Sequence, residues 1–138
     1  MTVQRTCRTA QSKVTVRIRP PRTYLVYAVE VRGTRPVFAL EDALGRVLLS
    51  SDQPPDHGTV WTRHWSQATG DIPPAPRGQI THVLTMSFLG SFSADAQYNY
   101  KVWRRGGDGG VKLIKDCVYT STQARDEFRE PLIVRLVR

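Results

Sequence analysis

The stretch that decides the fold is Gln79–Leu89, which reads QITHVLTMSFL. One set of alternate positions is mostly apolar and consists of Ile80, His82, Leu84, Met86 and Phe88. Successive side chains of an extended chain point to opposite faces, so this period of two predicts a strand with one face in a core. Residues 13–19, KVTVRIR, alternate in the same way and predict a strand with one apolar and one cationic face.

Further strand candidates follow at short intervals along the chain. Residues 23–31 are almost entirely β-branched, aromatic or apolar, which is typical of a central strand that is covered on both faces. The other candidates are 59–65, 96–104, 111–119 and 132–137. Residues 37–49 fit either a helix or a hairpin, and we favour the hairpin because Gly45 is costly inside a helix.

One short helix is expected near residues 121–130. Thr120, Ser121 and Thr122 offer hydroxyl caps, and Pro131 disfavours helical conformation at the residue before it. Together these elements predict a mainly β protein, an antiparallel β-sandwich of about eight strands with this one helix.

Length and composition describe an ordinary soluble globular chain. Its 138 residues, 40% of them hydrophobic and 23% charged, suit one folded unit. We expect a basic N-terminal arm over residues 1–12 and a single sandwich domain over residues 13–138. No apolar run approaches the roughly 20 residues of a membrane span, so no transmembrane segment is expected. No signal peptide is evident either, which leaves the cytoplasm or a mature secreted form as alternatives.

The formal charge of +8 is concentrated near the N-terminus, because residues 1–22 contain six basic residues and no acidic one. Such a segment attracts nucleic acid, acidic membrane surfaces or other polyanions, although excess arginine also serves solubility alone. The candidate anion-binding residues are Lys13, Arg17 and Arg19, on the cationic face of the predicted strand 13–19.

A second candidate site joins aromatic and cationic side chains. Trp61, Arg63 and Trp65 share one face of a predicted strand and could form a strip that stacks on a sugar or a base, unless the tryptophans fill the core. Trp103 alternates with Tyr98 and Tyr100, so inward tyrosines would leave it on the surface. The ligand-binding candidates are Trp61, Arg63, Trp65, Trp103 and Arg104.

Short segments within residues 98–130 also resemble fungal fruiting-body lectins. They read YNYKVW at 98–103, YTS at 119–121 and RDEFRE at 125–130, within about a quarter of the chain. Those lectins are β-sandwich sugar binders, so the resemblance implies a carbohydrate ligand. It assigns no binding residues.

The residues of common catalytic and metal sites are present without their usual spacing. His57, His64 and His82 match no helical or knuckle zinc pattern, so no catalytic residue, metal or cofactor is assigned. Cys7 and Cys117 are too few for a disulfide scaffold and could be bridged or free.

The sequence therefore supports three hypotheses. The first is a non-enzymatic binding module for a glycan or a protein, using surface aromatic and arginine residues. The second is an anion-directed binder of nucleic acid or acidic membrane, and the third is a small hydrolase with a histidine-containing cleft. The sequence does not determine the oligomeric state.

Overall fold

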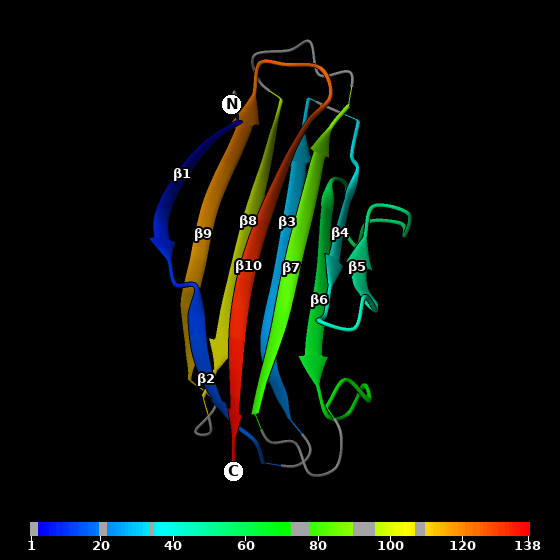
Figure 1. Cartoon of the computed structure of the whole chain (residues 1–138). Coiled ribbons are helices and arrows are strands. Elements are labelled where there is room, and N and C mark those ends of the chain that lie inside the picture. The colour runs from blue at the N-terminus through cyan, green and yellow to red at the C-terminus, as the bar shows by residue number, and fades with distance from the viewer. Residues whose placement is uncertain (1–2, 20–21, 34, 73–77, 90–95, 107–109) are drawn as a thin grey trace.

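A computed structural model of the chain describes residues 3–19, 22–33, 35–72, 78–89, 96–106 and 110–138. These residues form ten strands: β1 Val3–Ala10, β2 Lys13–Arg17, β3 Thr23–Arg32, β4 Phe38–Glu41, β5 Val47–Ser50, β6 Val60–Ser66, β7 Gly78–Phe88, β8 Gln97–Arg105, β9 Val111–Ser121 and β10 Asp126–Val137. Most of the strands run nearly along one axis (Figure 1).

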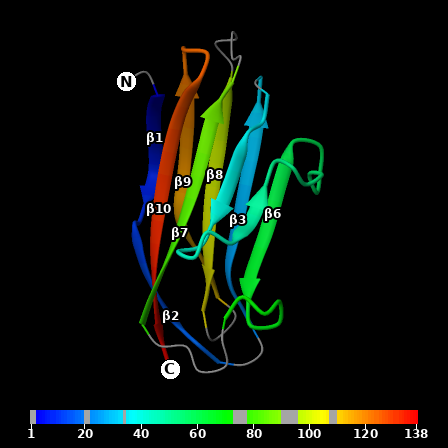
Figure 2. The same ribbon diagram turned by 45° about the vertical axis from the view of Figure 1, so that its right-hand side comes forward.

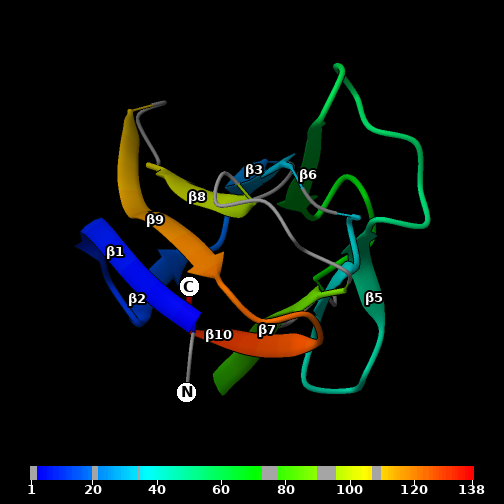
Figure 3. The same ribbon diagram turned by 90° about the horizontal axis from the view of Figure 1, so that it is seen from above.

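The strands pack as two sheets of five. The first sheet has the order β1-β9-β8-β3-β6, and the second has the order β2-β10-β7-β4-β5. Figure 3, which looks along the strands, shows the sheets as two layers with β1 and β2 at one side. The predicted mainly β sandwich is therefore confirmed, with ten strands in the described residues instead of about eight.

The N-terminal segment contributes to both sheets. β1 pairs antiparallel with β9 in the first sheet, and β2 pairs parallel with β10 in the second. Figure 2 shows β1 and β2 following one another along the same side of the sandwich. Most of the segment that the sequence assigns to a basic arm is thus paired backbone, and the chain changes sheets between Ala10 and Lys13.

The core lies between the sheets, and the alternation along β7 sets its pattern. His82, Leu84, Met86 and Phe88 are completely buried, as the sequence predicts. On the other sheet, four tyrosines are completely buried and face the same interior: Tyr27, Tyr98, Tyr100 and Tyr119. Burying one aromatic side chain removes about 150–250 Å² from water, so these rings supply much of the stabilisation.

A charged cluster and a disulfide fix the side of the sandwich that carries β1. Glu130 of β10 is 3% exposed and accepts hydrogen bonds from Arg5 Nη2 at 2.7 Å and Arg5 Nε at 3.1 Å. The ammonium of Lys115, itself buried, also donates to Glu130. Cys7 and Cys117 face each other across β1 and β9 and form a disulfide, which answers the question the sequence left open.

Residues 37–49 form the hairpin that the sequence favours. β4 and β5 pair antiparallel, and the turn between them is closed by Asp42, whose carboxylate accepts from the backbone nitrogens of Leu44 and Arg46. Gly45 has a φ of 77° there, a conformation that glycine adopts without a steric penalty.

The helix expected near residues 121–130 is wrong. Ser121 ends β9, a short bend follows, and Asp126 already begins β10. Phe128 and Glu130 point inward while Glu127 and Arg129 are exposed, so tertiary packing imposes the period of a strand on residues with helical propensity. Pro131 pairs only with β7, because β2 pairs with β10 from Ile133 onward. A proline, which lacks a backbone N–H, is tolerated where a strand has one neighbour.

The described structure contains no candidate for a membrane-spanning helix. Within the ranges that the structure describes, no helix has the length and apolar character needed to cross a bilayer.

Candidate functional site

The tryptophan strip expected on β6 is inside the protein. Trp61 is 6% exposed, and its indole nitrogen donates to the carbonyl of Gln53 at 2.8 Å. Trp65 is 1% exposed and lies edge-on to the rings of Tyr24 and His82. Their shared face is the inner face of the sheet, so the two indoles stabilise the core and are not an accessible platform.

Arg63 lies between these tryptophans and makes structural contacts. Its guanidinium donates to the carboxylate of Asp71 at 2.5 Å and to the carbonyl of His64 at 2.8 Å. The same Asp71 carboxylate accepts from the backbone nitrogen of Ser66 at 3.2 Å and from the hydroxyl of Thr69. The ion pair therefore anchors the turn after β6, and the guanidinium of Arg63 is held in a contact within the fold.

Trp103 and Arg104 leave the sheet on opposite sides of β8. Trp103 is half-buried and is in register with Val26 of β3 and Leu113 of β9 on the outer face. The sequence predicts this outward position for Trp103 if Tyr98 and Tyr100 face inward, and both tyrosines are buried. Arg104 is in register with fully buried Leu25, and its Nε is buried without a hydrogen-bond partner.

The outer face of β8 combines aromatic and cationic side chains, as the sequence predicts for β6. Lys101 and Arg105 are exposed, and half-buried Trp103 lies between them on the same face. We call these three residues the β8 strip. Residues two apart on a strand are separated by roughly 6.7 Å, so a cation, an indole and a cation follow each other at even intervals.

β2, β8 and β10 terminate at the same end of the sandwich (Figure 1). Arginines from distant parts of the chain line two hollows there. A small hollow there is lined by Arg17, Arg19, Arg22, Thr23, Tyr24, Arg105 and Gly106. Of the predicted anion-binding residues, Arg17 and Arg19 line the same hollow. Lys13 lies four residues before Arg17 on β2, roughly 13 Å away.

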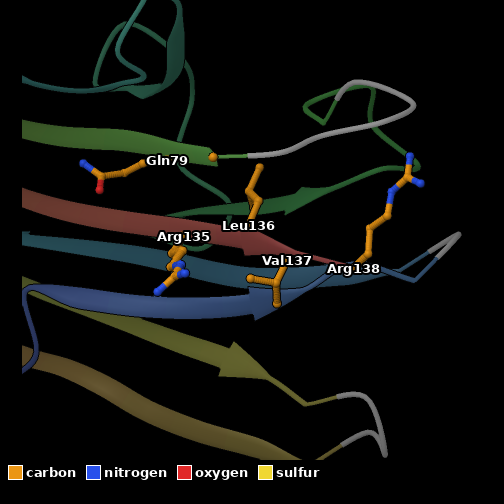
Figure 4. Close-up of a pocket in the computed structure, with 6 residues that line it drawn as sticks. Gln79, Arg135, Leu136, Val137 and Arg138 are labelled. Carbon is orange, nitrogen blue, oxygen red and sulfur yellow. The ribbon is translucent and has the colours of Figure 1, made fainter.

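A second, wider recess lies where β7 begins and β10 ends. It has a volume of about 630 Å³ and is lined by Gly78, Gln79, Arg135, Leu136, Val137 and Arg138. Figure 4 shows Arg135, Leu136, Val137 and Arg138 at the end of β10, with Gln79 on the neighbouring strand β7. Lining residues of the two hollows are neighbours across the β2–β10 pair, because Arg17 is in register with Val137.

We call the six arginines that line these hollows the arginine end: Arg17, Arg19, Arg22, Arg105, Arg135 and Arg138. Among the described residues that line either hollow, none is Asp or Glu. A guanidinium presents five donors in a planar fork that matches carboxylate, sulfate and phosphate oxygens. The arginine end is therefore a surface suited to anionic groups.

One backbone segment of the arginine end is fixed by a tyrosine. The hydroxyl of Tyr24 accepts from the backbone nitrogen of Arg19 at 2.7 Å and donates to its carbonyl oxygen at 2.6 Å. The neighbouring Ile18 is buried, and its nitrogen donates to the carbonyl of Val137 at 2.7 Å. The backbone between Arg17 and Arg19 is thus held in place before any ligand binds.

The three histidines lie in different surroundings. His57 is exposed in a loop, His64 is exposed on the outer face of β6, and His82 is completely buried. The Nδ1 of His82 is hydrogen-bonded to the hydroxyl of Tyr27. Burial lowers the pKa of His82 to about 4, so the ring is neutral near pH 7. Neither of the two described hollows is lined by a histidine.

Sequence reasoning missed four of the six arginines and the residue that organises them. Arg22, Arg105, Arg135 and Arg138 join the arginine end through neighbours that no local pattern reveals. Tyr24 resembles any other aromatic residue of an apolar strand, so its contact with Arg19 has no signal in the sequence. The alternation that places Trp103 on the same face as Lys101, by contrast, was readable.

Metal sites and known relatives add no assignment. In the part of the chain that the structure describes, no group of three or more His, Cys, Asp or Glu side chains could hold a metal ion. No protein-family model, curated protein or solved structure matches this chain. The resemblance of residues 98–130 to fungal fruiting-body lectins therefore gains no support from known proteins.

Proposed function

We propose that this protein is a binding module for an extended anionic ligand, which it engages through the arginine end. The observation that carries the proposal is that six arginines line two hollows with lining residues paired across β2 and β10, and that the described lining contains no acidic side chain. Arginines that lie close together raise the local positive potential, and this potential attracts an anion.

The size and shape of the surface favour a ligand with several charges. The arginine end extends from Arg105 at the end of β8, past Arg17, to Arg135 and Arg138 on β10. A single small anion would meet only part of this surface. A chain of regularly spaced anionic groups could reach both hollows at once, and each contact would release counterions from the polymer.

Binding of inorganic polyphosphate tests the proposal, because this polymer offers charge without rings or apolar groups. The affinity is measured by isothermal titration calorimetry at several salt concentrations. The double variant Arg17→Gln/Arg135→Gln removes one arginine from each hollow. We expect it to weaken binding by about tenfold and to reduce the slope of log affinity against log salt by about two.

The matched control is Arg8→Gln/Arg129→Gln, which removes the same charge from exposed positions on β1 and β10. Arg129 lies six residues before Arg135 on one strand, roughly 20 Å away. We expect the control to retain most of the affinity. Equal losses in both double variants would show a response to net charge alone and would contradict the proposed site. Binding that stays constant with salt would contradict it as well.

A further inference from the structure

We propose that the anionic ligand is an acidic polysaccharide, one of whose sugar rings stacks on Trp103. Its carboxylate or sulfate groups then bind Lys101, Arg105 and the arginine end. This inference rests on the proposed function, because it names the ligand class for the same surface. It adds the β8 strip to the site.

The first support is the alternation of the β8 strip itself. Trp103 lies between two exposed cations on one face of β8. A pyranose ring has a face of C–H groups that packs on an aromatic ring, while its acidic substituents project from the edge. A polymer in which rings alternate with charged substituents therefore complements a row in which an indole alternates with cations.

The second support is the floor around Trp103. Its register neighbours Val26 and Leu113 are both half-buried, so apolar side chains lie beside the indole on each side. These neighbours hold the ring on the sheet and leave part of it exposed. Trp61 and Trp65 are almost completely buried instead, which makes Trp103 the indole that a ligand can reach.

The third support is continuity with the arginine end. Arg105 is the last residue of β8 and belongs both to the β8 strip and to the hollow that Arg17 and Arg19 line. A ligand that starts over Trp103 thus meets the arginine end without crossing another surface. The broad face of a sheet and the end of the sandwich do not share a plane, so a flexible chain fits both surfaces better than a flat bilayer does.

The fourth support concerns the compartment in which the ligand is met. Cys7 and Cys117 form a disulfide, and disulfides persist in oxidising environments such as the periplasm and the cell exterior. Acidic polysaccharides are abundant polyanions on cell surfaces. This observation favours a polysaccharide over a nucleic acid, which also combines flat rings with charge.

The test compares three polyanions that differ in what they offer to an indole. Fluorescence anisotropy measures binding of labelled heparin oligosaccharide, polyphosphate and oligothymidylate to the full chain and to Trp103→Ala. We expect Trp103→Ala to weaken heparin binding by about tenfold and to leave polyphosphate binding unchanged. Trp103→Phe should retain most of the heparin affinity, and Gln97→Ala, on the same face at the far end of β8, should retain all of it.

Each other outcome has a definite meaning. Heparin binding that survives Trp103→Ala overturns the inference, and the arginine variants then still decide the proposed function. Equal losses for heparin and polyphosphate also overturn it, because a polymer without rings cannot stack. Tighter, Trp103-dependent binding of oligothymidylate would make the ligand a nucleic acid. Failure of all three polyanions to bind would overturn the proposed function together with the inference.

Discussion

The hydroxyl of Tyr24 holds both the backbone nitrogen and the carbonyl oxygen of Arg19, at 2.7 and 2.6 Å. A strand residue that helps to form the core thereby fixes the backbone of an arginine at the protein's surface. The ring of Tyr24 packs against Trp65, and its oxygen reaches the chain next to the buried Ile18. Core packing and the geometry of the arginine end are therefore coupled through one side chain.

Removal of this hydroxyl should weaken anion binding more than its effect on stability suggests. Tyr24→Phe keeps the ring and deletes two hydrogen bonds to Arg19, so we expect about a threefold loss of polyphosphate affinity and about 1 kcal/mol of stability. Titration calorimetry and urea denaturation measure the two effects. Tyr98→Phe is the control, since the hydroxyl of Tyr98 accepts from the nitrogen of Val37 at 2.9 Å, far from the arginine end. An equal loss of affinity in both variants would disprove the coupling.

Reduction of the disulfide should destabilise the fold strongly. The bond joins residues 110 apart in sequence, and a loop of this length corresponds to about 4–5 kcal/mol by the chain-entropy model. We expect the urea midpoint to fall when a reductant is added, and Cys7→Ala to show the lower midpoint with and without reductant. An unchanged midpoint in protein whose two thiols are shown to be free would contradict this prediction.

Neutralising Glu130 should leave a buried cation without its partner. Burial raises the pKa of this carboxyl, but the hydrogen bonds from Arg5 and Lys115 outweigh burial, and the pKa lies below its usual value. Glu130→Gln leaves the buried ammonium of Lys115 uncompensated, so we expect a loss of about 3 kcal/mol in the free energy of unfolding. Glu127→Gln changes the same type of residue at an exposed position of β10 and should have little effect. A loss no larger than that of Glu127→Gln would show that the ion pair is not needed.

Stability should fall as the pH drops through the range in which His82 would normally gain a proton. Burial lowers the pKa of His82 from 6.5 to about 4 in the folded protein. Between these values the unfolded chain binds a proton that the folded protein does not, so stability is fully present above pH 6.5 and declines toward pH 4. The decline amounts to about 3 kcal/mol.

Urea denaturation across this pH range measures the effect. His82→Phe deprives the hydroxyl of Tyr27 of its partner, which lowers stability equally at every pH, but it should remove the decline due to residue 82. A variant that keeps the full slope would assign the pH dependence to other groups.

Most of the strands were predictable because their pattern is local, whereas β1 lies in the segment that the sequence assigns to a basic arm. The alternation of Leu84, Met86 and Phe88 requires only that an extended chain has a covered side, and the hairpin over 37–49 follows from the preference of Gly45 for a positive φ. The helix expected near 121–130 failed for the complementary reason. Hydroxyl caps and helical propensity act over a few residues, and the pairing of Asp126–Leu136 with β7 outweighs them.

The candidate site depended on choosing which alternating face is covered, and local pattern could not decide this. Both faces of β6 mix polar and apolar residues, so Trp61 and Trp65 could equally lie outside, and the structure places them inside. On β8, Tyr98 and Tyr100 compete with Trp103 for the interior, and the tyrosines take it. The accessible combination of indole and cation is therefore on β8, which β3 separates from the predicted strip on β6.

By itself the sequence determined that this chain forms strands with one covered face, because side-chain alternation is a property of consecutive residues. Tertiary structure alone decided that Arg17, Arg105 and Arg135 share one end of the sandwich, since strand order joins residues that are far apart along the chain. The physical reason is that backbone hydrogen bonds and burial, added over whole strands, decide which strands pair. No short segment of the sequence contains enough of these contacts to predict the pairing.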